Sequence, residues 1–404
     1  MRAEERSGLG ARGGAIPRLA LAGLLLAIVA AAVNLRPSIT GVGAVIGSIK
    51  ADTGISNTTA GLLVTLPLIG FAALAPFAPR LSERLGSDRT MAAVLVLLAT
   101  GIAIRSLPGV AALFAGTAIL GAAIAVGNVL MPTLVKRHFP GRPGLLTGFY
   151  TTALSLVGSL APGLTVLVAV RGGLGWRAAL GLWAVLAALG AAIWLPRIFG
   201  DRGRPDAAGA FSSSRLPLGS GLAWQVTVFM GGSALSFYVT IAWLPQLLES
   251  RGFGAVAAGW TLSASQLAGL VVTFGIPVLA GRLPNQRALA AIASLATCAG
   301  FGGLIFATGA MAAVWAVLLG LGQSATFSLA LTLMVLRARD AGGASGLAGM
   351  AQSGGYLLAA AGPVLIGALH DASGSWTVPL VALAASSLVM MTAGILAGAN
   401  AQVA

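Results

Sequence analysis

Long apolar runs separated by short polar breaks make up almost the whole chain. A run of about 20 residues is long enough for a helix to cross the hydrocarbon core of a bilayer. Backbone polar groups in a bilayer must pair within the protein, so such runs predict helices. The pattern predicts an all-α membrane protein with twelve transmembrane helices at 16–48, 57–78, 89–106, 110–135, 144–170, 176–196, 219–248, 255–280, 286–308, 312–336, 343–369 and 376–397.

One break is longer and more polar than the others and divides the runs into two sets of six. Residues 197–217 are rich in Gly, Pro, Ser and charge, as expected for a loop. Residues 79–89 also align with residues 277–287 through shared Pro, Leu and Arg positions. Such repeats are typical of transporters that bind substrate between their halves. We expect a cytoplasmic tail at 1–15 and a six-helix bundle at 16–196. A cytoplasmic linker at 197–217 then leads to a second, pseudo-symmetric six-helix bundle at 218–397 and a C-terminal tail at 398–404.

Composition and charge agree with this topology. The chain is 57% hydrophobic and 8% charged, whereas soluble domains have about 25% charged residues. The net charge of +14 comes mainly from Arg and Lys in the tail, the linker and alternate loops. The positive-inside rule then places both termini in the cytoplasm. The charge is thus a topology signal, so we expect the bilayer rather than nucleic acid as partner.

Several chemistries lack the residues that they need. The single cysteine, Cys298, excludes a disulfide framework and a cysteine metal site. His138 and His370 lie at predicted helix ends, and none of the acidic residues lies mid-membrane. A buried nucleophile with a base, or a metal-ligand set, is therefore missing. We expect no enzyme, no metal and no cofactor, and a buried proton site is not visible.

A charged residue interrupts the first apolar run near its middle. Asn34 and Leu35 precede Arg36, and Pro37 follows it. A charge at this depth costs several kcal/mol and marks a functional site by default. Pro37 removes a backbone donor and frees carbonyls to face a cavity. One interpretation is a structural arginine satisfied by helix carbonyls or by Asn34. The other, which we favour, is a cation that binds substrate.

The remaining polar residues of the apolar runs are candidates for the same site. Predicted helices three, six, nine and twelve carry no Asn, Gln, Tyr or His apart from Gln286 at a loop edge, as a lipid-facing shell requires. Buried amides can instead connect two helices, and a Trp near a helix end can anchor it at the membrane interface. With Arg36 and Asn34, the candidate substrate-binding residues are Asn128, Tyr150, Tyr238, Trp243, Gln266, Gln323, Gln352 and Tyr356. The candidate helix bends are Pro37, Pro162, Pro245 and Pro363.

The break between the second and third runs resembles a motif of the major facilitator superfamily. It reads Glu83, Arg84, Leu85 and Gly86, followed by Asp88 and Arg89. Pro79 stands where the first Gly of the motif is expected, and in the second half Gly281 replaces the acid beside Arg282. The resemblance covers essentially the whole chain. It implies the major facilitator fold and a cytoplasmic gate made by Glu83, Arg84, Asp88, Arg89 and Arg282.

Four patches are similar to the cyanate/2-nitroimidazole (CynX/NimT) transporter family. They are 34–37, 127–132, 136–140, and Tyr238 with 243–245. This resemblance implies secondary transport of a small molecule, often anionic or nitro-bearing, in a bacterial inner (plasma) membrane. As a habit of the superfamily, we also expect a monomer.

These observations lead to one hypothesis and a runner-up. In the first, the halves alternate around a central site where Arg36 binds an anionic substrate, Asn34 and Asn128 donate hydrogen bonds, and tyrosines form the walls. In the second, the protein exports neutral drug-like compounds and Arg36 is structural. A receptor that does not transport differs from both by the absence of ligand flux.

Overall fold

The computed structural model describes residues 18–74, 77–139, 143–200 and 216–403. In these ranges the chain is helical apart from short turns, and twelve helical segments are long and apolar enough to cross a membrane. The prediction of an all-α protein with twelve spans is therefore confirmed. The predicted tail 1–15 and most of the predicted linker lie outside the described residues.

The first six spans come from residues 18–200. The first span consists of α1 (Arg18–Asn34), α2 (Pro37–Thr40), the 3₁₀ turn η1 (Gly43–Val45) and α3 (Ile46–Thr53). The next five are α4 (Asn57–Leu74), α6 (Ser87–Arg105), α7 (Val110–His138), α8 (Pro143–Val166) with its π-helical extension η3 (Leu167–Arg171), and α9 (Gly175–Trp194). Short helices α5 (Ala78–Leu85) and α10 (Pro196–Gly200) follow α4 and α9.

The last six spans are single helices. They are α11 (Gly221–Glu249), α12 (Ala255–Arg282), α13 (Arg287–Phe306), α14 (Ala310–Leu336), α15 (Ala341–Ser373) and α16 (Thr377–Ala397). Residues 398–403, predicted as a tail, fold back on this half, because the Val403 amide donates to the Arg337 carbonyl at 2.8 Å.

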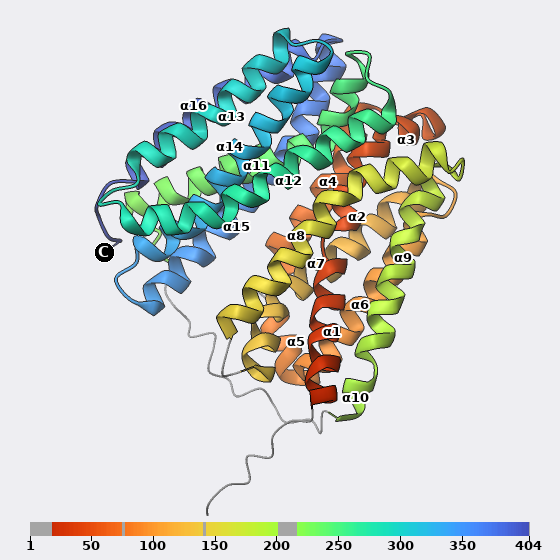
Figure 1. Ribbon diagram of the computed structural model, residues 1–404, viewed down its shortest axis with the longest axis vertical. Coiled ribbons are helices and arrows are strands. Elements are labelled where there is room, and N and C mark those ends of the chain that lie inside the picture. The colour runs from red at the N-terminus through yellow and green to blue at the C-terminus, as the bar shows by residue number, and fades with distance from the viewer. Residues whose placement is uncertain (1–17, 75–76, 140–142, 201–215, 404) are drawn as a thin grey trace, which may run out of the picture.

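The helices form two groups that lie side by side, α1–α10 and α11–α16 (Figure 1). The N-terminal half packs against the C-terminal half through α4 on α15 and α8 on α12, and η1 also contacts α11. We call the end at which α9 ends and α11 begins the linker end. The opposite end, where α3 leads into α4 and α15 into α16, is the distal end.

The first apolar run is not the single helix that its length predicts. Helix α1 ends at Asn34, and Arg36 has φ −123° and ψ −41°, outside regular helix geometry. Pro37 supplies no N–H, so the helical bond pattern cannot pass through it. The chain resumes as α2 with Pro37 in its first turn, a position that tolerates proline. Arg36 therefore lies in a break between two helices.

Prolines inside other spans also open carbonyls, and neighbouring helices use them. Pro162 lies within α8, so the carbonyl of Gly158, four residues earlier, loses its usual donor. The Thr40 hydroxyl donates to that carbonyl at 2.7 Å. Pro277 lies within α12, and the Ser328 hydroxyl donates at 2.9 Å to the Thr273 carbonyl that it leaves open. The carbonyls that these prolines leave open thus accept hydrogen bonds that connect neighbouring helices.

The repeat found in the sequence places equivalent residues in equivalent contacts. Asp88 aligns with Gln286, and each is 3% exposed at the start of the third span of its half. Asp88 accepts a hydrogen bond from His138 at 3.1 Å, and the Gln286 side chain accepts one from Arg337. His138 ends α7 and Arg337 follows α14, so both contacts tie the third span to the fourth.

Candidate functional site

The two halves meet most closely where glycines allow backbones to touch. A Cβ added at Gly43 would overlap the carbonyl oxygen of Ile241, the carbonyl that Pro245 leaves without its helical donor. A Cβ added at Gly61 would lie 2.6 Å from the Pro363 carbonyl oxygen. These contacts bring the first span against α11, and α4 against α15, in the distal parts of the helices.

A carboxylate of one half caps a helix of the other half at the distal end. Asp371, near the end of α15, accepts hydrogen bonds from the backbone N–H groups of Asn57 at 3.2 Å and Thr58 at 2.8 Å. These residues begin α4, where the first N–H groups have no partner in the helix and negative charge is favoured. The Asn57 amide and the Thr58 hydroxyl also donate to Asp371, at 2.6 and 2.7 Å.

Further polar side chains gather around this contact. The Asn57 side-chain oxygen accepts hydrogen bonds from Lys50 and from Gln246. Lys50, Gln246, Glu249 and His370 also line a cavity of about 600 Å³ that is open to the distal side. We call Asn57, Thr58 and Asp371 the distal latch, because these three residues join α4 to α15 across the two halves.

Arg36 lies between the halves, beside an aromatic ring. The guanidinium carbon is 5.4 Å from the centre of the Phe237 ring on α11. The stem of Arg36 packs on α8 at Gly158, where an added Cβ would lie 2.9 Å from the Arg36 Cβ. The side chain is half-buried, and among the described residues no carboxylate forms an ion pair with it. The face of the Phe237 ring thus stabilises its charge.

Five aromatic side chains from four helices are linked by ring contacts, and one of them, Phe237, lies beside Arg36. Phe237 and Tyr238 lie on α11, Phe327 on α14, Tyr356 on α15 and Phe71 on α4. The ring centres lie 5.2 Å apart for Phe237 and Tyr238, 6.5 Å for Phe237 and Phe327, 6.4 Å for Tyr238 and Tyr356, and 5.9 Å for Phe71 and Tyr356. We call Phe71, Phe237, Tyr238, Phe327 and Tyr356 the aromatic cluster. It offers ring faces and two hydroxyl groups beside one cation.

Two expected site residues form hydrogen bonds within their own half of the protein. The Asn34 amide donates to the Ala30 carbonyl at 2.7 Å and to the Leu186 carbonyl of α9 at 3.2 Å, so it connects helices within the N-terminal half. The Gln323 amide donates to the Ser236 carbonyl and the Thr240 hydroxyl, at 2.9 and 2.7 Å, and connects α14 to α11. Carbonyls and a hydroxyl therefore occupy the amide donors of Asn34 and Gln323, and the binding of substrate by these two residues stays a prediction.

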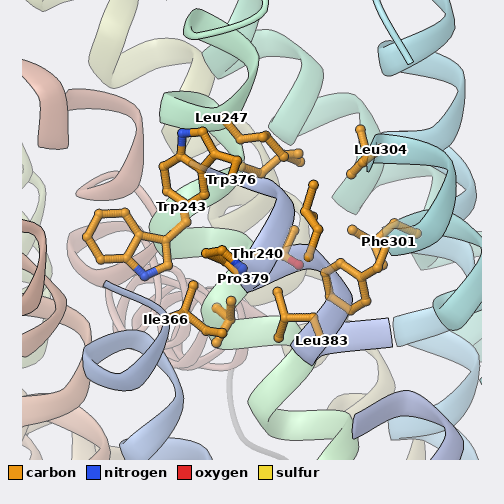
Figure 2. A pocket seen from close by; sticks show the side chains of 13 residues that line it. Thr240, Trp243, Leu247, Phe301, Leu304, Ile366, Trp376, Pro379 and Leu383 are labelled. Atoms are coloured by element: carbon orange, nitrogen blue, oxygen red, sulfur yellow. The ribbon is translucent and has the colours of Figure 1, made fainter. Parts of the chain in front are cut away.

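Trp243 is also engaged within its own half. It is 2% exposed, its indole N–H donates to the Pro363 carbonyl at 2.9 Å, and its ring lies 5.9 Å from that of Trp376. Trp243 and Trp376 line a small apolar cavity of about 20 Å³ together with Phe301 and Leu383 (Figure 2). Apolar voids of this size are packing gaps. Trp243 is therefore buried, and its indole N–H is used within the C-terminal half.

The other expected substrate-binding residues differ in exposure. Asn128 is exposed on α7, whereas Tyr150 on α8 is 6% exposed. Gln266 and Gln352 are half-buried, and the Gln266 amide nitrogen has no hydrogen-bond partner. Gln266 lines a void of about 10 Å³ that also borders Phe237. Of these four residues, Gln266 is thus the one placed beside the aromatic cluster by a described contact.

The expected gate residues lie at the linker end. Asp88 is buried and contacts His138 and Arg137 of its own half, at 3.1 and 3.9 Å. The side chains of the other expected gate residues are exposed: Glu83, Arg84, Arg89 and Arg282. The resemblance implied a role in gating for the whole motif, and the structure gives Asp88 a role in packing α6 on α7.

Sequence reasoning missed the three phenylalanines of the aromatic cluster. Phe71, Phe237 and Phe327 belong to apolar runs in which Phe also occurs on exposed faces, as Phe274 does at 52% exposure. The sequence of such a run does not show whether a Phe lines a cavity or contacts lipid. The adjacent Tyr238 was the available signal, because a polar aromatic residue within a span needs a partner.

Comparison with known proteins identifies the family. The family model described as Major Facilitator Superfamily matches residues 19–360. The "Uncharacterized transporter YycB" of Bacillus subtilis (strain 168) is 44% identical over 372 residues, which cover 92% of each chain. The "2-nitroimidazole transporter" of Escherichia coli (strain K12) is 40% identical over 380 residues, 94% of this chain and 96% of the relative. The "Cyanate transport protein CynX" of Escherichia coli (strain K12) is 28% identical over 357 residues, 87% and 91% of the two chains.

Solved structures agree on the fold. The nucleoside transporter NupG superposes with a TM-score of 0.73 at 14% identity and covers 93% of this chain and 98% of its own. The D-xylose-proton symporter superposes with a TM-score of 0.71 at 16% identity and covers 94% and 96%. The chain is therefore a multi-pass membrane transporter that belongs to the Major Facilitator Superfamily, as the family model, the relatives and the twelve spans agree.

Proposed function

We propose that this transporter carries small, planar, anionic or nitro-bearing molecules and binds them between its halves at Arg36. The observation that carries the proposal is the position of the Arg36 guanidinium. It is half-buried between the two halves, beside Phe237, and no described carboxylate neutralises it. The linker end would face the cytoplasm, because basic residues concentrate there.

Electrostatics favours an anionic ligand at this position. A cation held inside a membrane protein costs several kcal/mol unless an opposite charge or water compensates it. A guanidinium presents parallel N–H groups that match a carboxylate or nitro group, so it can orient a planar ligand as well as attract it. The ring faces of Phe237 and Tyr356 can then contact the body of that ligand.

The related transporters support the chemical class. One relative is named for 2-nitroimidazole and another for cyanate, and both ligands are small and planar or linear with electron-rich ends. The membrane potential constrains the direction of transport. Moving an anion into a negative-inside cell costs about 2.3 kcal/mol per 100 mV. Uptake of an anion would therefore need exchange or a proton carried by the substrate, whereas export would not.

A second function is favoured by one contact. The Phe237 ring already stabilises the Arg36 guanidinium, by about 0.5–2 kcal/mol in typical cases. With Arg36 held in this way, the remaining wall of the site is aromatic and uncharged. The protein would then export neutral planar compounds, and Arg36 would be structural.

A thermal-shift panel distinguishes the two functions. Purified wild type and Arg36→Gln would be heated with cyanate, nitrate, benzoate and neutral 2-nitroimidazole. A ligand at 100 times its Kd stabilises a protein by about 2.7 kcal/mol, which is measurable. We expect at least one anion to stabilise wild type, and Arg36→Gln to lose that response.

Arg251→Gln is the matched control. The Arg251 guanidinium donates to the carbonyls of Ala307 and Ile305 within the C-terminal half, away from the aromatic cluster. Its substitution should leave the anion response intact. Stabilisation by 2-nitroimidazole alone, equal in wild type and Arg36→Gln, would reject the anion site and favour the neutral exporter.

A further inference from the structure

A second arginine, Arg105, is buried close to the break that carries Arg36. It ends α6 and is 1% exposed. No described carboxylate pairs with it, and it makes one hydrogen bond, from Nη1 to the Ser38 carbonyl at 2.6 Å. Burying an unpaired cation costs several kcal/mol. A buried arginine with this energetic cost and one directed hydrogen bond indicates a role that a neutral side chain could not have.

The Ser38 carbonyl is free because the first span is irregular. In a continuous helix this carbonyl would accept from the N–H of Val42, four residues later. That N–H instead donates to the Ile39 carbonyl at 3.3 Å. Ser38 is 1% exposed, so its carbonyl would be buried without a donor if Arg105 were absent. Such a group costs about 1–3 kcal/mol.

The contact fixes the segment that presents Arg36. Ser38 lies two residues after Arg36, and the Arg36 carbonyl accepts from the amides of Ile39 and Thr40 at 3.0 and 3.1 Å. On the opposite flank Thr40 donates to the Gly158 carbonyl, which lies next to the Arg36 stem. Residues 36–40 are thus held from α8 through Gly158 and from α6 through Arg105. A shift of either contact would move the Arg36 guanidinium relative to the aromatic cluster.

We infer that Arg105 is a positioning residue for the substrate site: its hydrogen bond to Ser38 holds the break of the first span so that Arg36 faces the aromatic cluster. This inference rests on the proposed function of Arg36. Arg105 does not contact substrate. Among the described residues its Nε and Nη2 and the Ser38 hydroxyl are buried without partners, which leaves donors for ordered water at the same place.

Hydrogen exchange of the ligand-free protein tests the positioning itself. In Arg105→Met, amides within residues 36–45 should exchange at least tenfold faster than in wild type. Arg105→Lys, which keeps a cationic donor, should restore part of the protection. Arg337→Met is the control, because Arg337 is 3% exposed and donates to the Ala397 and Gly398 carbonyls of the other half. It should lower the melting temperature without changing exchange in 36–45.

A double-mutant cycle with benzoate connects this positioning to binding. Arg105→Met should raise the Kd for benzoate about tenfold in wild type and have little further effect in Arg36→Lys, because coupled residues are not additive. If Arg105→Met exchanges residues 36–45 at the wild-type rate, the inference is overturned and Arg105 is structural. The same holds if Arg105→Met raises the Kd for benzoate equally in wild type and in Arg36→Lys.

The failures of the two proposals are distinguishable. If no anion of the panel binds wild type, or Arg36→Gln binds that anion normally, the proposed function fails whatever Arg105 does. Only the present inference fails if Arg36→Gln no longer binds benzoate while Arg105→Met keeps wild-type hydrogen exchange in residues 36–45 and wild-type affinity for benzoate.

Discussion

At the scale of single residues, similar side chains receive different roles from their partners. Arg36 lies in the break of the first span and Arg105 of α6 contacts that break, yet the first arginine contacts a ring and the second a carbonyl. Among the described residues the Arg36 guanidinium makes no hydrogen bond, so its N–H donors stay available to a ligand while it contacts the ring of Phe237. Its immediate partner should therefore tune its affinity.

Replacing the ring beside Arg36 tests this role. Phe237→Leu keeps an apolar side chain but removes the cation–π contact, worth about 0.5–2 kcal/mol. The guanidinium then becomes less ordered, and we expect the Kd for benzoate, measured by titration calorimetry, to rise about twofold to thirtyfold. Phe274→Leu on the exposed face of α12 is the control and should not change it. Unchanged affinity in Phe237→Leu would mean that this ring plays no part in the site.

At the scale of elements, the prolines and glycines of the spans set how helices meet. Pro162 and Pro277 free carbonyls that hydroxyl groups of neighbouring helices use, and Gly43 and Gly61 allow the halves to touch. The distal latch adds a helix cap between halves, from Asp371 to the start of α4. A cap of this kind contributes about 0.5–2 kcal/mol. We expect this cap to hold the two halves together at the distal end.

Weakening the latch should open the distal end. Asp371→Asn removes the negative charge that the α4 N-terminus favours, so we expect the distal-open population to rise several-fold. Spin labels at Ala51→Cys on α3 and Ala372→Cys on α15, in a Cys298→Ser background, would report the distance by pulsed electron resonance. Asp340→Asn is the control, because Asp340 caps its own helix at Gly343 (2.7 Å). A distance distribution identical to that of the parent protein would show that Asp371 does not hold the halves together.

The element scale also shows what could be predicted from sequence. Span positions followed from apolar length, because the bilayer sets that length for every helix. A bend was expected at Pro37, but the apolar run alone did not show that α1 ends at Asn34 and leaves Arg36 outside helix geometry. The direction of Asn34 toward Leu186 depends on how α1 is rotated against α9. Rotation is a product of packing between spans, so one apolar run cannot reveal it.

At the scale of the whole molecule, two similar halves enclose one asymmetric site. The repeat gives both halves the same packing, as in the pairs of Asp88 with His138 and Gln286 with Arg337. The site breaks this symmetry, because the N-terminal half supplies the cation and the C-terminal half supplies most of the aromatic cluster. The proposed binding of substrate at Arg36 would therefore require both halves, as transport by alternating access does.

Exchange in proteoliposomes tests the central claim most directly. Vesicles loaded with unlabelled benzoate would receive labelled benzoate outside, with wild type, Arg36→Gln or Arg251→Gln in the membrane. We expect wild type and Arg251→Gln to accumulate label above empty vesicles, and Arg36→Gln to fall at least tenfold while its melting temperature without ligand stays near that of wild type. Exchange by Arg36→Gln at the wild-type rate would contradict the account and leave Arg36 a structural residue.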